Sequence, residues 1–293
     1  MSAIAKILIN EGYIVSGSDM ESSPVTYELG ELGVRINTKQ DGESIEPDTN
    51  LVITSAAINE NNPDLQKARS LGLKVVKYSE FLGVLMRTKY GIAVSGTHGK
   101  TTTTAMISTI LQKNGHEPTF VIGGTVSGIG GNSRLGRGNH FVAEACEFDR
   151  TFLNLTPQIG VITNIEEDHL DYYKDLDGIT EAFAEFVSLI PKDGLLVVNS
   201  DDINIRKVIK DAKCKVESYS IVTESDFLNQ ITSSSRIDLE TNSVELSIAN
   251  ELYKRTSTES NAKWLAIVTH SGKNGNHFSV FEKGEYYGDF CLK

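Results

Sequence analysis

A glycine-rich turn between an apolar strand and a helix carries the strongest chemical signal in this sequence. The apolar run ends at Val94 and Ser95, and the stretch GTHGKT follows. Strand, glycine turn and helix in this order direct backbone N–H groups and the positive end of the helix at phosphate oxygens. The turn therefore predicts a nucleotide-binding site, made of the consecutive residues Gly96, Thr97, His98, Gly99, Lys100, Thr101 and Thr102.

The residue types in the turn have distinct roles in this prediction. Gly96 and Gly99 lack the Cβ atom that would obstruct the phosphate or forbid the backbone angles. Lys100 is expected to reach the β- and γ-phosphates of ATP, and the Thr101 hydroxyl to bind Mg²⁺. His98 either contacts substrate or satisfies backbone groups of the loop. The alternative for the whole turn is a glycine cap on a structural helix.

The turn departs from the general phosphate-loop motif at one position. That motif has glycine five residues before Gly99, where this sequence has Val94. A helicase or nucleic-acid motor is therefore disfavoured. The formal net charge of -11 also argues against broad attraction to nucleic acid or anionic lipid. Any phosphate group has to be held by local geometry.

Two further polar residues follow apolar runs. Glu144 ends the predicted strand 141–143, and Asn164 comes shortly after the apolar Ile162. Ligands of parallel-sheet domains bind at the carboxyl ends of strands, and a nucleotide-bound Mg²⁺ or Mn²⁺ prefers hard oxygen ligands. We predict that Glu144 is a cation ligand and that Asn164 contacts the nucleotide. A turn or helix N-cap is the alternative role for Asn164.

Short runs rich in Val and Ile alternate with segments of helical spacing. This pattern is typical of βαβ units, so the predicted fold class is α/β. Helices are expected at 4–10, 25–32, 63–71 and 78–88, and strands at 13–16, 51–54, 74–76 and 91–94. From about Ser233, short alternating stretches such as 243–247 and 264–268 predict an antiparallel meander or sheet edge.

A boundary near Lys89 divides the chain into two predicted α/β domains. Residues 1–88 form a Rossmann-like parallel-sheet domain, and residues 89–293 form a phosphate-loop ATPase domain that we expect to be incomplete at its end. The first domain opens on a helix, whereas such folds normally open on a strand and a glycine-rich turn. We therefore expect that strand to precede Met1.

Composition narrows the class of protein. The length of 293 residues and the hydrophobic fraction of 39% fit one to three globular domains. Cys146, Cys214 and Cys291 form no C-x-x-C pair, so a zinc site or disulfide framework is not expected, and we predict buried thiols in a reducing compartment. A signal peptide and an apolar run of about 18 residues are both lacking. The prediction is a cytoplasmic protein without membrane insertion.

Five stretches together resemble the Mur ligase family. Residues 15–19 (VSGSD) and 53–58 (ITSAAI) resemble the uridine-nucleotide domain of the family. Residues 96–103 (GTHGKTTT) have the loop form typical of its L-alanine-adding member. Residues 141–149 (FVAEACEFD) resemble the acidic strand end of the family, and residues 162–171 (ITNIEEDHLD) resemble its second metal block. The resemblance runs from Met1 to at least Val198. Two positions differ, because the family usually has Asp at Cys146 and often Ser at Phe148.

The resemblance implies a function and residue roles. The expected reaction is ATP-dependent ligation of L-alanine to the lactyl carboxylate of UDP-N-acetylmuramate through an acyl phosphate, in peptidoglycan precursor synthesis. Residues 1–88 would bind the UDP-sugar. Lys100, Glu144 and His169 would be catalytic. Thr101 and Glu144 would bind Mg²⁺ or Mn²⁺, and His169 would bind a second such ion, with Asp168 supporting it. Without the resemblance, His169 is read as a solvated or packed side chain.

The resemblance also implies further chain and leaves rivals open. Complete family members have a third domain for adenine and amino-acid contacts, expected here after Lys293, so these residues by themselves are not expected to complete the ligation. One rival is the recycling ligase that attaches a preformed peptide to the same sugar nucleotide, although residues 152–159 favour the alanine-adding member. Folate or cyanophycin ligases usually lack the loop histidine. A non-catalytic nucleotide-binding module is the rival from another class, and the oligomeric state stays open.

Overall fold

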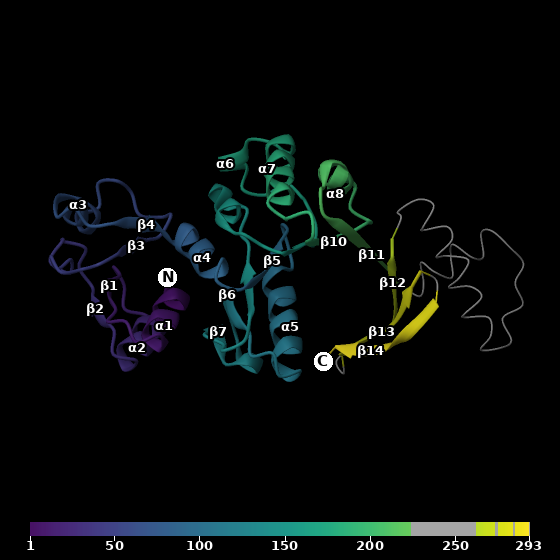
Figure 1. Ribbon diagram of the computed structural model, residues 1–293, viewed down its shortest axis with the longest axis horizontal. Coiled ribbons are helices and arrows are strands. Elements are labelled where there is room, and N and C mark those ends of the chain that lie inside the picture. The colour runs from purple at the N-terminus through teal and green to yellow at the C-terminus, as the bar shows by residue number, and fades with distance from the viewer. Residues whose placement is uncertain (224–261, 273–274, 284, 293) are drawn as a thin grey trace, which may run out of the picture.

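The computed structural model describes residues 1–223, 262–272, 275–283 and 285–292, and within them helices alternate with strands (Figure 1). The predicted α/β class is confirmed. The α-helices are α1 Ser2–Asn10, α2 Pro24–Glu31, α3 Pro63–Ser70, α4 Tyr78–Met86, α5 Lys100–Lys113, α6 Leu170–Tyr173, α7 Leu176–Ser188 and α8 Ile203–Val208. Short 3-10 helices are η1 Ser127–Ile129, η2 Phe148–Asn154 and η3 Ile209–Asp211.

One large sheet dominates the structure, with two small sheets on the N-terminal side. The large sheet has the order β14-β13-β12-β11-β10-β9-β5-β8-β6-β7, and the small sheets are β1-β2 and β3-β4. The strands are β1 Ser16–Ser18, β2 Arg35–Asn37, β3 Val52–Thr54, β4 Val75–Lys77, β5 Tyr90–Ser95, β6 Thr119–Val126, β7 Gly131–Arg134, β8 His140–Glu144, β9 Ile159–Ile162, β10 Leu195–Asn199, β11 Lys215–Thr223, β12 Trp264–Gly272, β13 Gly275–Glu282 and β14 Glu285–Leu292.

The middle of the large sheet is parallel and buried on both faces. All pairings from β12 across to β6 are parallel, and β7, β13 and β14 are antiparallel additions at the two edges. Successive side chains of a strand point to opposite faces. Ile92 and Val142 accordingly pack with Ala105 of α5, whereas Ala93 and Ala143 belong to the larger core with Phe183 of α7. Burial on both faces explains the continuous apolar runs in the sequence.

The N-terminal helix ends at a glycine and packs into the large core. Gly12 has a φ of 88°, its N–H donates to Ile9, and the Tyr13 N–H donates to Leu8. These bonds form a Schellman cap, and the helix ends at Asn10, where the sequence predicted its end. Ala3 and Ile7 lie in the same core cluster as the sheet residues of β5 and β8.

Several sequence predictions need correction. The first strand was expected at 13–16 but begins at Ser16, because β2 pairs with β1 only from Ser16 onward; Ile14 is 94% exposed. The short strand β2 was not predicted. Of the three cysteines only Cys214 is buried, whereas Cys146 and Cys291 are exposed, so the prediction of buried thiols is wrong for those two.

The C-terminal meander is confirmed where the structure describes it. Strands β12, β13 and β14 are sequential antiparallel neighbours, and the predicted stretch 264–268 lies in β12. The predicted stretch 243–247 lies outside the described residues. In the described part of the chain, no helix combines the length and the apolar character needed to cross a membrane.

Glu217 of β11 ties the meander to the parallel part of the sheet. Its Oε1 accepts from Nζ of Lys215 at 2.6 Å and from Nζ of Lys263 at 2.9 Å, and its Oε2 accepts from the Trp264 indole at 3.2 Å. Hydrogen bonds from Lys215 and then Lys263 lower the pKa of Glu217 to about 2. Because this folded-state pKa lies below the ordinary 4.5, the carboxylate stabilises the fold above about pH 4.5 and loses that effect as the pH falls toward 2.

The substitution Glu217→Gln is expected to lower the free energy of unfolding at pH 7 by about 1–3 kcal/mol, because the charge-assisted bonds are lost. The difference from wild type should shrink as the pH falls below 4.5. Urea unfolding at pH 7, 4 and 3 measures it, with the exposed Glu285→Gln as the matched control. A destabilisation that stays constant with pH would contradict this assignment.

Candidate nucleotide and cation site

The predicted site residues meet at one edge of the large sheet because three parallel strands end there together. Strand β5 lies between β8 and β9, with Val94 opposite Glu144 and Ser95 opposite Ile162. Parallel strands in register send their carboxyl ends to the same edge. The loops that leave β5, β8 and β9 therefore start side by side.

The glycine turn after β5 has the backbone that the sequence predicts. Gly96 has a φ of 131°, and Gly99, the N-cap of α5, has a φ of 82°. Both angles lie in the region that favours glycine. A Cβ at Gly96 would also stand 2.0 Å from Oγ1 of Thr163 and 3.1 Å from the Asn164 nitrogen. Both glycines are thus required by the fold of the loop.

The segment after β9 clamps this loop. The Thr163 hydroxyl donates to the His98 carbonyl at 2.6 Å, and the Thr97 N–H donates to the Asn164 carbonyl at 3.0 Å. The Asn164 side chain accepts from the His98 N–H at 2.8 Å and donates to the His98 carbonyl at 3.1 Å. Asn164 therefore fixes the loop backbone, and none of the N-caps of the described helices is Asn164. Its direct contact with a nucleotide stays a prediction.

The His98 side chain points away from this clamp. It is 68% exposed, and its Nε2 lies 3.8 Å from a carboxylate oxygen of Glu166, an ion pair only when the imidazole is protonated. The backbone groups of His98 are used by the loop, whereas its ring is free to meet a ligand from solvent. Thr102 in the first turn of α5 is exposed as well.

Lys100 is folded back onto its own loop. Its Nζ donates to the carbonyls of Gly96 at 2.5 Å and Thr97 at 3.0 Å, and to Oε1 of Glu147 at 3.0 Å. The Lys100 side chain is 14% exposed and that of Glu147 is 3% exposed. An ammonium group has three donors, and these three contacts use all of them. These contacts fix the position of the lysine within the loop.

Glu144 and Thr101, two of the predicted cation ligands, are in contact. The Thr101 hydroxyl donates to Oε1 of Glu144 at 2.9 Å, and the Gly123 N–H donates to Oε2 at 2.6 Å. A Cβ at Gly123 would stand 3.1 Å from that carboxylate, so glycine lets β6 approach it. Burial, together with the nearby negative charge of Glu144, raises the pKa of Tyr78 to about 12, so the phenol is neutral at physiological pH.

His169, the third predicted ligand, lies in a different group. One ligand atom from each of Glu147, Asp168 and His169 lies within 4.8 Å of the others. The His169 Nε2 is 3.9 Å from Oδ2 of Asp168, and its ring centroid is 4.9 Å from that of Phe148. Two carboxylates and an imidazole suit Mg²⁺ or Mn²⁺, so the donor set fits the predicted cation.

The segments that carry this group have unusual backbone angles. His169 has a φ of 51°, and Asp149 and Arg150, just after Glu147, have φ values of 52° and 54°. Non-glycine residues adopt this region at a cost and do so often at functional sites. The Tyr173 hydroxyl also donates to the Glu147 carbonyl, which ties the segment after β8 to α6.

Three residues of the site were not predicted from the sequence. Glu147 lies in the same acidic stretch as Glu144, Thr163 precedes Asn164, and Gly123 opens a Gly-Gly pair within β6. Glu147 and Gly123 had visible signals, a second carboxylate and a glycine pair in an apolar run. Nothing in the spacing of Thr163 indicates that its hydroxyl reaches back to the loop.

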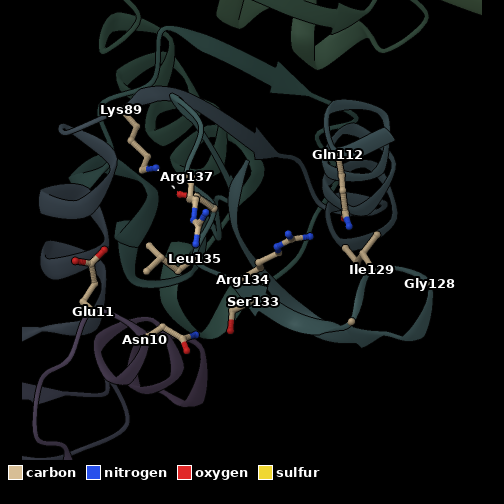
Figure 2. Close-up of a pocket in the computed structure, with 12 residues that line it drawn as sticks. Asn10, Glu11, Lys89, Gln112, Gly128, Ile129, Ser133, Arg134, Leu135 and Arg137 are labelled. Carbon is tan, nitrogen blue, oxygen red and sulfur yellow. Dashed lines mark hydrogen bonds between the residues drawn. The ribbon is translucent and has the colours of Figure 1, made fainter. Parts of the chain in front are cut away.

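A separate hollow lies away from these residues. It has a volume of about 1030 Å³ and lies between the end of α1 and the β6–β7 hairpin, with Glu11, Lys89 and Arg134 among its lining residues (Figure 2). Lys89 donates to the carbonyls of Gly136 and Gly138 at 2.8 and 2.6 Å. None of the predicted nucleotide or cation residues lines this hollow, which therefore is not the phosphate-loop site.

Comparison with known families and curated proteins gives consistent matches. Residues 1–90 match the Mur ligase family catalytic domain, and residues 94–282 match the Mur ligase middle domain. Curated UDP-N-acetylmuramate–L-alanine ligases are similar: that of Clostridium botulinum is 47% identical over 222 residues, 75% of this chain and 48% of the relative. That of Acetivibrio thermocellus is 45% identical, also over 75% of this chain and over 47% of the relative. The chain spans about half the length of these curated relatives.

Solved structures share the fold. The UDP-N-acetylmuramate-alanine ligase of Thermotoga maritima has a TM-score of 0.76 at 24% identity, covering all of this chain and 57% of that one. The UDP-N-acetylmuramate:L-alanyl-γ-D-glutamyl-meso-diaminopimelate ligase of Neisseria meningitidis has a TM-score of 0.77 at 23% identity, covering 99% of this chain and 82% of that one. At these identities the likeness establishes the architecture alone.

The substitution Gly96→Ala is expected to lower the free energy of unfolding by about 2–4 kcal/mol and to abolish nucleotide binding, because the added Cβ meets Thr163 and the φ is unfavourable. Thermal unfolding and calorimetric titration with ADP measure the two effects. Gly30→Ala in α2, where nothing lies within 4 Å of the added atom, is the matched control. Unchanged ADP affinity in Gly96→Ala would refute the role given to the turn.

Proposed function

Because this chain belongs to the Mur ligase family, we propose that it acts in the ATP-dependent ligation of L-alanine to the lactyl carboxylate of UDP-N-acetylmuramate. The observation that carries the proposal is the 47% identity to curated L-alanine ligases over a stretch of 222 residues. The product would be a peptidoglycan precursor. The phosphate loop and the carboxylates beside it would supply the chemistry that such a reaction needs.

We assign the binding of the two nucleotide substrates to two parts of the chain. Residues 1–88 would hold the UDP-sugar, and residues 89–293 would hold ATP through the turn that begins at Gly96. The family matches to residues 1–90 and 94–282 support this division. A location in the cytoplasm, where both substrates would be made, belongs to the same proposal.

Placement of the reacting groups accounts for most of the catalysis in this scheme. The N–H groups of the loop and the start of α5 would bind the phosphates, and Lys100 would neutralise charge on the transferred group. Thr101 and Glu144 would hold one Mg²⁺ or Mn²⁺ ion, and His169 with its neighbouring carboxylates a second. Such cations would stabilise the negative charge that develops on the phosphate oxygens.

The chemistry requires no covalent enzyme nucleophile. A carboxylate is a poor electrophile, so phosphorylation by ATP would first convert it to an acyl phosphate. The amine of L-alanine would then attack that carbonyl, displace phosphate and leave an amide. The enzyme's contribution is to align the carboxylate with the γ-phosphate and to exclude water.

The recycling ligase, which joins a preformed peptide to the same sugar nucleotide, is the nearest alternative. The fold does not separate the two, since the Neisseria peptide ligase and the Thermotoga alanine ligase have nearly equal TM-scores. Curated sequence relatives at 45–47% identity are named as L-alanine ligases, which supports L-alanine as the substrate.

Ligation is tested in the longest natural protein that carries this sequence, by phosphate release and amide formation with UDP-N-acetylmuramate. Release should require L-alanine and should fall by at least about 1000-fold in Lys100→Ala, because the transferred phosphoryl group loses its cationic contact. Lys113→Ala at the far end of α5 is the control for loss of one lysine. Turnover with the preformed tripeptide and not with L-alanine would establish the recycling reaction instead, and nucleotide binding without turnover would establish a binding module.

A further inference from the structure

Glu147 is buried, and only one of its two carboxylate oxygens has a hydrogen-bond partner among the described residues. Its residue is 2% exposed, and its Oε1 accepts from Lys100 at 3.0 Å. Its Oε2 is buried and has no hydrogen-bond partner among the residues that the structure describes. A buried carboxylate oxygen without a partner is costly, which points to a ligand at this position.

Two features of the surroundings indicate which ligand that is. A ligand atom of Glu147 lies within 4.8 Å of ligand atoms of Asp168 and His169, which provides a hard donor set for a small divalent cation. Glu147 also contacts the positively charged Lys100, whose three N–H donors are all engaged. Lys100 can therefore reach a phosphate only by giving up at least one of these contacts.

We propose that Glu147 is a positioning residue that holds Lys100 while no nucleotide is bound and, once Lys100 turns to phosphate, becomes a ligand of the cation beside Asp168 and His169. This inference rests on the proposed function for the identity of the nucleotide, but the exchange of partners follows from the contacts of Glu147. The ammonium and the cation compete for one carboxylate.

This exchange couples nucleotide and cation binding. When Lys100 leaves, Glu147 becomes an unpaired buried charge, and a cation at Asp168 and His169 compensates for it. Binding of one ligand then strengthens the other by the same factor. A merely structural Glu147, which only fixes the loop, would produce no such coupling.

The coupling is tested on the nucleotide-free chain, with Mn²⁺ as the probe and electron paramagnetic resonance to count bound ions. Lys100→Met should bind Mn²⁺ about tenfold more tightly than wild type, because Glu147 loses its competing partner. This gain in Mn²⁺ affinity should vanish in the double variant that combines Lys100→Met with Glu147→Gln. It should return in part in the double variant that combines Lys100→Met with Glu147→Asp. Because no ATP or sugar nucleotide is present, the outcome is independent of ligase activity.

Lys77→Met is the matched control for the lost positive charge. Lys77 is exposed, and its Nζ lies 3.5 Å from Asp149, two residues beyond Glu147, so a general electrostatic effect would appear there too. Thermal unfolding checks that each variant is folded. Equal Mn²⁺ affinity in wild type and Lys100→Met, an equal gain in Lys77→Met, or a gain that survives in the double variant would each overturn the proposal.

In the same chain, Glu147→Gln should bind metal-free ADP about fivefold more tightly than wild type, because Lys100 is no longer held by an opposite charge. Glu167→Gln, an exposed carboxylate near His169, controls for the lost negative charge. Weaker or unchanged ADP binding in Glu147→Gln would show that Glu147 only supports the loop, and would contradict the exchange.

Discussion

The parallel pairing of β5 with β8 on one side and β9 on the other is the constraint on which the site depends. With Val94 opposite Glu144 and Ser95 opposite Ile162, three chains leave the sheet at one edge. The loop after β5 has to turn directly over the segment after β9, and this close approach accounts for the requirement for glycine at Gly96. A one-residue slip in either pairing would reverse the faces of the strand and separate the loop from its clamp.

Local charge explains how an acidic protein can hold a phosphate group. The chain has a formal net charge of -11, and the site contains the carboxylates of Glu144, Glu147 and Asp168, of which Glu147 contacts Lys100. Backbone N–H groups and Lys100 cannot by themselves offset these charges and those of a triphosphate. In the proposed function, divalent cations would offset this negative charge, and the carboxylates are where such cations would bind.

The sequence predicted the parts of the fold that depend on local pattern. Strands β5 and β8 were visible as apolar runs, and the turn at Gly96 followed from residue type. The start of β1 was misplaced because a three-residue polar strand is defined by its partner and not by an apolar run. The same holds for Thr163, whose hydroxyl acts across the sheet edge, because sequence spacing carries no information about that contact.

Glu144 and Glu147 show why spacing alone could not assign the site. They stand three residues apart, yet Glu144 ends a strand and is fixed by the N–H of Gly123 and the hydroxyl of Thr101. Glu147 lies beyond the strand, just before the left-handed angles of Asp149 and Arg150, and its carboxylate contacts Lys100. Its neighbours on the other side are Asp168 and His169, so its surroundings come from three separate segments. The first carboxylate accepts from a hydroxyl and a backbone N–H, and the second accepts from the Lys100 ammonium. Two acidic residues of one short stretch are thereby suited to different tasks, a distinction that only the folded chain creates.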